Sequence, residues 1–112
     1  MRSGDLETAE KHLEPILRMQ KDLLGALDED TIDTALALGE LLTRKKQYTQ
    51  AEDHYQDWLG RLEDANHEIR LRCKASLAWM YSRWGHYRDA ELLLRQVIAA
   101  QKDQPLFAVV AP

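Results

Sequence analysis

The residues best suited to chemistry in this sequence are two arginines and a tryptophan. Arg72, Trp79 and Arg83 are separated by seven and then four residues, which places them on one face of a predicted helix over 68–84. A guanidinium group can hold a carboxylate through two parallel hydrogen bonds, and tryptophan is a favoured anchor at protein interfaces. The three residues therefore predict a peptide-binding surface. The alternative is that Trp79 packs in the core and both arginines are merely solvated.

No catalytic or metal-binding set is apparent in the sequence. The serines lack a glycine-rich turn that would present a nucleophile, and there is no glycine-rich phosphate loop. The four histidines do not have metal-site spacing, and His54, beside Glu52 and Asp53, is expected on a solvated helix face. The lone Cys73 lies in a helical apolar pattern and is expected to be a buried thiol. We therefore expect no enzyme activity, no cofactor and no metal.

The composition predicts one small soluble domain. The chain has 112 residues, 30% of them charged, and a net charge of -4. No stretch resembles a signal peptide or approaches 18 apolar residues, so we expect a cytoplasmic protein. The mild net charge gives no reason to expect nucleic acid or a membrane as partner. The charge is uneven, because residues 1–56 have a balance of -5 and residues 57–112 a balance of +1, so two copies could meet head to tail.

Three stretches of the chain repeat one pattern. Residues 4–10, 46–52 and 85–91 each end in Ala-Glu and carry Leu or Tyr three residues before that alanine. The three alanines are 42 and then 39 residues apart. Self-similarity at a nearly fixed period of this length indicates a helical solenoid.

Apolar spacing between these stretches predicts five helices. The first contains Pro15, which is expected to kink the helix rather than divide it. The second is expected to have Asp30 as its N-cap, and its internal Gly39 indicates that another helix approaches closely. The last is expected to turn Leu94 and Ile98 inward. The predicted ranges are 5–24, 31–44, 48–62, 68–84 and 87–102.

The small and large residues of this pattern resemble those of tetratricopeptide repeats. In that family a small residue and a Tyr or Leu in one helix precede an alanine in the next. Here the small residue precedes the alanine by 12 residues and the Tyr or Leu precedes it by 9, in both of two consecutive repeats. The residues at these offsets are Gly39, Leu42 and Ala51, followed by Ala78, Tyr81 and Ala90.

The 42-residue spacing is similar to the longer repeats of the kinesin light chain group. Its junction motif is Leu-Gly followed by His-Pro-Asp-Thr-Leu. Leu24-Gly25 and Asp30-Thr31-Ile32 match it in register, but Asp28 and Glu29 replace the His-Pro, and the second junction keeps only His67. The resemblance covers roughly residues 4–103. It implies an all-α solenoid of antiparallel helices, in which the five helices follow the order B-A-B-A-B, where A and B are the first and second helix of each repeat.

The resemblance also implies where a partner would bind, because the A helices of this family line the concave surface. The repeat register places Leu36, Ala37, Thr43 and Ala75 on that surface. It also places there the polar and aromatic residues that we predict to contact a peptide. These are Asp33, Glu40, Arg44, Arg72, Ser76, Trp79, Ser82 and Arg83.

The two ends of the predicted array are open. The first B helix has no A partner and the last has no capping helix, although solenoids generally have polar caps. We therefore expect a homo-oligomer or part of a longer array. The repeat domain is expected to span residues 1–104, and the apolar tail 105–112 either docks or frays.

Three functions remain open at this point. The first is a protein–protein interaction scaffold that binds a peptide or helix on the concave face. The second is a self-assembly element that works through the open helix edges. The third is a regulatory fragment of a larger multidomain protein.

Overall fold

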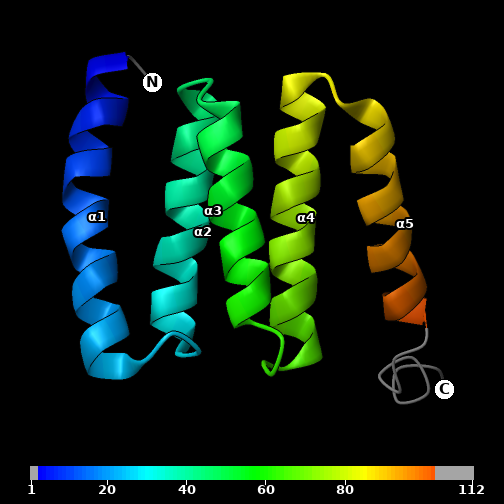
Figure 1. The fold of residues 1–112 in the computed structure, drawn as a ribbon, viewed down its shortest axis with the longest axis horizontal. Helices are drawn as coiled ribbons and strands as arrows, with labels where there is room; N and C mark the ends of the chain where they lie inside the picture. The colour runs from blue at the N-terminus through cyan, green and yellow to red at the C-terminus, as the bar shows by residue number, and fades with distance from the viewer. Residues whose placement is uncertain (1–2, 103–112) are drawn as a thin grey trace, which may run out of the picture.

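The computed structural model describes residues 3–102, which form five helices and, within that range, no strand (Figure 1). This confirms the all-α class, and each observed end lies within two residues of its predicted position. The tail, residues 105–112, lies outside the described residues, so its docking stays a prediction. The helices are α1 (Ser3–Leu24), α2 (Glu29–Arg44), α3 (Tyr48–Arg61), α4 (His67–Trp84) and α5 (Tyr87–Lys102).

One proline lies inside α1, and a glycine with positive φ follows α1 and α4. α1 continues through Pro15 and is not divided by it. Gly25 follows α1 at φ +91° and Gly85 follows α4 at φ +87°, in the left-handed region that favours glycine. Each glycine therefore reverses the chain into the next helix. None of the five helices is long and apolar enough to cross a membrane.

The predicted N-cap of α2 was wrong by two residues. Asp28, in an extended conformation, is the N-cap, and its carboxylate accepts a hydrogen bond from the backbone N–H of Asp30 at 2.9 Å. Asp30 is already inside the first helical turn. Asn66 caps α4 in the same way, by accepting from the N–H of Ile69 at 3.0 Å. Both caps satisfy N–H groups that the helix itself leaves unpaired.

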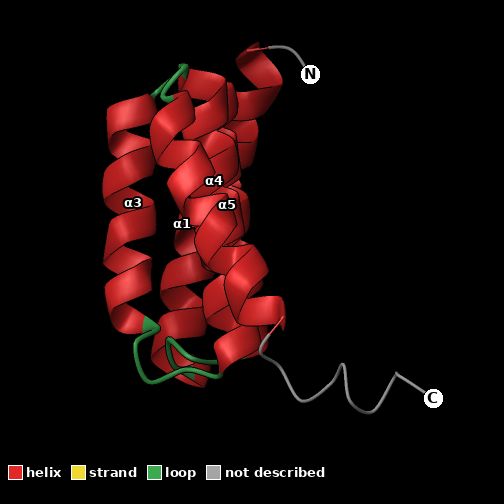
Figure 2. Cartoon of the chain, turned by 90° about the vertical axis from the view of Figure 1, so that its right-hand side faces the viewer, coloured by secondary structure: helices red, strands yellow, loops and turns green. Residues whose placement is uncertain are grey.

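The helices stack side by side in chain order. Each helix packs against the next, and α2 also contacts α4 directly. Figure 2 shows α3 on one side of the array, apart from α4 and α5. The apolar core runs through all five helices, from Leu6 and Leu17 of α1 to Ala90 of α5.

Gly39 permits the close helix approach that its position predicts. A Cβ atom built on Gly39 of α2 would lie 2.5 Å from Cζ of Tyr55 on α3, a side chain with no exposed surface. Cys73 of α4 is also fully buried, as predicted, and its Sγ lies 3.9 Å from the carbonyl oxygen of Tyr55. Burial raises the pKa of the Cys73 thiol to about 11.

The outer faces of the first and last helices are apolar and exposed. The prediction that Leu94 and Ile98 of α5 point inward was wrong, because these side chains are 46% and 51% exposed. Ala90 and Val97 do face the core. The physical reason is that Leu94 and Ile98 lie on the side of α5 where the described array ends.

Candidate peptide-binding groove

The surface between α2 and α4 is hollowed by two adjoining depressions of about 480 and 340 Å³. They share Glu40, Ala75 and Ser76, so they form one continuous channel, which we call the α2/α4 groove. The α2 side lies next to the α4 side because these two helices contact each other. The groove is lined by Asp33, Leu36, Ala37, Glu40, Tyr55, Arg72, Ala75, Ser76 and Trp79.

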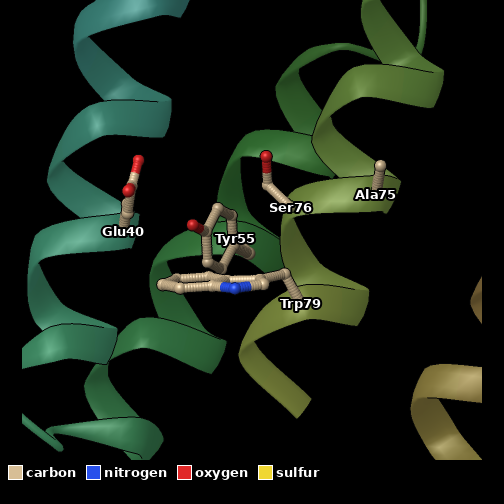
Figure 3. A pocket seen from close by; sticks show the side chains of 5 residues that line it. All are labelled: Glu40, Tyr55, Ala75, Ser76 and Trp79. Atoms are coloured by element: carbon tan, nitrogen blue, oxygen red, sulfur yellow. The ribbon is translucent and has the colours of Figure 1, made fainter. Parts of the chain in front are cut away.

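Trp79 is neither a core residue nor a freely exposed one. Its side chain is half-buried and forms one wall of the smaller depression (Figure 3). The guanidinium carbon of Arg44, from α2, lies 5.8 Å from the centre of the indole ring, and that of Arg83, from α4, lies 5.9 Å away. Both distances allow cation–π attraction. The two arginines therefore hold the indole at the rim of the groove.

Two ion pairs set the charge of the groove. Arg72 of α4 donates to Asp33 of α2 at 2.6 Å, which ties the two helices together at one end. Arg44 donates to Glu40, four residues earlier on α2, at 2.7 Å. Within residues 3–102, Arg83 makes no ion pair. Of Arg44, Arg72 and Arg83, only Arg83 is therefore without a carboxylate partner among these residues.

Tyr55 is a groove residue that the sequence analysis did not predict. It belongs to α3, but its ring lies behind the gap that Gly39 leaves in α2, and it closes the floor of the smaller depression (Figure 3). Its hydroxyl oxygen is buried and has no hydrogen-bond partner among the described residues. Burial raises the pKa of this hydroxyl well above its ordinary value, so it remains a neutral donor. The sequence signal for the contact between α2 and α3 was the small Gly39 in one helix and the large Tyr55 in the next.

The structure brings seven of the eight predicted binding residues together. Five of them line the groove, and Arg44 and Arg83 contact the ring of Trp79. Ser82 is exposed on α4 but does not line the groove. The placement of Thr43 on this surface was wrong, because its side chain is buried and its hydroxyl donates to the carbonyl oxygen of Gly39 at 2.9 Å.

His54 also departs from its predicted solvated position. It is partly buried between α3 and α2, and its Nε2 lies 2.6 Å from the carbonyl oxygen of Ala35. Because a carbonyl can only accept, Nε2 carries the proton. Burial lowers the pKa of His54, so the ring is neutral near pH 7. This contact joins residues 19 positions apart, and local spacing could not have revealed it.

Comparisons with known families agree with this architecture. A model of the tetratricopeptide repeat matches residues 1–64, more than half of the chain, and a second tetratricopeptide repeat model matches residues 70–102. The chain belongs to the tetratricopeptide repeat family. Repeats of this family generally mediate protein–protein interaction and form a non-enzymatic type of scaffold. No curated protein matches the sequence significantly.

Solved structures share the fold of this tetratricopeptide repeat chain. One crystal structure of nearly identical repeats, from a proposed kinesin light chain of Podosopora anserina, superposes with a TM-score of 0.80 and 23% identity over 88% of this chain and 48% of that one. A related structure from the same organism superposes with a TM-score of 0.81 and 20% identity, over 97% of this chain and 51% of that one. The chain therefore spans about half the length of these proteins. At this identity the likeness shows the fold alone.

Proposed function

We propose that this chain is an interaction scaffold that binds a peptide or helix of a protein partner in the α2/α4 groove. The observation that carries the proposal is the half-exposed indole of Trp79, held between Arg44 and Arg83 at the rim of a continuous channel. Large aromatic residues and arginines in such settings are the residues that most often dominate binding energy at interfaces.

The groove offers a partner two kinds of contact. Trp79 and the alanines of both helices give an apolar surface for a side-chain anchor. Arg83 gives a cation next to that anchor, which favours a nearby carboxylate on the partner. At the other end, Asp33 and Arg72 already pair with each other, so they would guide the register of a partner more than they would add affinity.

A random peptide library displayed on phage, selected against the full 112-residue chain, tests this proposal. Selected peptides should bind the chain in titration calorimetry and lose about 30-fold or more in affinity with Trp79→Ala plus Arg83→Ala, because loss of a hot-spot residue costs at least about 2 kcal/mol. The matched control is Leu92→Ala plus Arg88→Ala on α5, which removes one large apolar side chain and one arginine from exposed positions outside the groove. Equal affinity for both double variants would refute the groove as the binding site.

A further inference from the structure

The exposed large apolar side chains of this protein are not scattered. In the described range they lie on the two end helices, with one exception beside α1. Single exposed apolar residues are ordinary on protein surfaces, but a set gathered on two faces marks interaction sites. On α1 they are Ile16, Met19, Leu23 and Leu24, on α5 they are Tyr87, Leu92, Leu94 and Ile98, and the exception is Leu27.

Three of the α5 residues form a stripe that the repeat normally buries. Tyr87, Leu94 and Ile98 follow each other at +7 and +4, so they lie on one side of the helix. Their equivalents 39 residues earlier are buried or partly buried: the ring of Tyr48 stacks on Trp84 of α4 with 5.6 Å between ring centroids. The full set of equivalents is Tyr48, Tyr55 and Leu59 of α3. The α5 stripe is therefore a helix-packing surface that no other helix within residues 3–102 covers.

The α1 stripe is the matching surface at the other end. Ile16, Met19 and Leu23 follow at +3 and +4, on one side of α1. The equivalent of Ile16, 42 residues later, is Trp58 of α3, which is buried. In the middle of the array this position is thus covered, and on α1 it is open. Figure 1 shows α1 and α5 at opposite ends of the array.

We propose that the occupant of the α5 stripe is the α1 stripe of a second copy of this chain. Charge favours unlike ends over like ends. α1 carries five carboxylates and three Lys or Arg, a balance of -2, and α5 carries three Lys or Arg and two carboxylates, a balance of +1. Pairing α1 with α1 would bring two negative helices together, whereas pairing α1 with α5 brings opposite charges together.

This contact is heterologous, because the two surfaces that meet are different. A dimer held by one such contact still presents one free α1 stripe and one free α5 stripe, so association that does not close into a ring continues into an open chain.

Two variants that each block one end test the proposal by analytical ultracentrifugation. One carries Leu94→Glu plus Ile98→Glu, and the other carries Ile16→Glu plus Met19→Glu. The wild-type chain should grow beyond its 13.0 kDa monomer mass as concentration rises. Each variant alone should sediment as a monomer, and an equimolar mixture should form a dimer of twice that mass. The mixture is informative because one intact α1 stripe and one intact α5 stripe remain available in it.

The matched control is Leu92→Glu, an equally apolar and exposed α5 residue outside the stripe, which should leave the assembly of the wild type unchanged. Circular dichroism checks that every variant keeps its helices, and alanine at the same positions replaces glutamate in any variant that does not. A wild-type monomer at all concentrations, a single variant that dimerises alone, or a mixture that stays monomeric would each overturn the proposal. Trp79→Ala plus Arg83→Ala should assemble normally, so failure here and failure of groove binding are distinguishable.

Discussion

Substituting Gly39 by alanine tests how tightly α2 and α3 are packed. The new Cβ would lie 2.5 Å from Cζ, 2.7 Å from Cε1 and 2.8 Å from the hydroxyl oxygen of Tyr55. Carbon atoms in contact normally sit about 3.5–4.0 Å apart, so the ring would have to move by about 1 Å. Tyr55 has no exposed surface, so a shift of its ring would displace side chains that pack around it.

Two opposing terms decide the sign of the effect. Alanine gains about 1 kcal/mol over glycine inside a helix. Overpacking a close-packed core costs about 1–3 kcal/mol, and a gap short by about 1 Å belongs near the upper end of that range. The net loss of unfolding free energy is therefore about 1–2 kcal/mol, and Tm should fall by about 5–10 °C. The larger Gly39→Leu change should unfold the chain.

Thermal and urea unfolding of four proteins measure this loss and its origin. The four proteins form a double-mutant cycle of the wild type, Gly39→Ala, Tyr55→Leu and the double variant. The shorter leucine should relieve the clash with the new alanine. We therefore expect a coupling free energy of about 1 kcal/mol or more between the two substitutions. Gly60→Ala is the matched control, because Gly60 is helical and no neighbouring atom lies within 4 Å of its new Cβ. It should raise Tm. A stabilised Gly39→Ala, or no coupling to Tyr55, would refute the packing argument.

Three further predictions concern single side chains. Asp28→Ala should cost about 1 kcal/mol of unfolding free energy through its lost cap, and Asp30→Ala less; the reverse order in urea unfolding would contradict the observed cap. Because burial lowers the pKa of His54 from its ordinary 6.5, the unfolded chain takes up a proton that the folded chain refuses, so stability should fall as pH drops below about 6.5. His54→Gln should lessen that fall in melts from pH 7.5 to 5.5. The Cys73 thiol, with its pKa raised to about 11, should react with a thiol reagent only after unfolding, and prompt reaction of the native chain would contradict its burial.

The helices could be predicted because their signals are local. Apolar spacing, the turn at Gly25 and the stop at Gly85 depend on residues that are neighbours in the chain. The cap of α2 was misplaced because both Asp28 and Asp30 are suitable caps, and only the observed extended backbone of Asp28 decides between them. The residue types at a helix start therefore predict that an N-cap exists, but they do not decide which residue is the cap.

The groove could be predicted only in part, because its chemistry depends on contacts between distant residues. The repeat register brought Trp79 and Arg83 to one surface, which spacing along one helix is enough to predict. It did not reveal that Arg72 is already paired with Asp33, 39 residues away, or that Tyr55 closes the floor. These contacts belong to pairs of helices, and no single helix carries a signal for them.

Exposure in this fold is decided by the neighbouring helix more than by the residue itself. Leu13, Tyr55 and Leu94 hold the same repeat position in α1, α3 and α5. Tyr55, which lies between two A helices, is fully buried, whereas Leu94, at the end of the described array, is nearly half exposed. The same position is therefore core in one repeat and exposed surface in another. A sequence pattern can say that such a residue will pack, and the number of repeats beside it determines whether it packs within its own chain or against a partner.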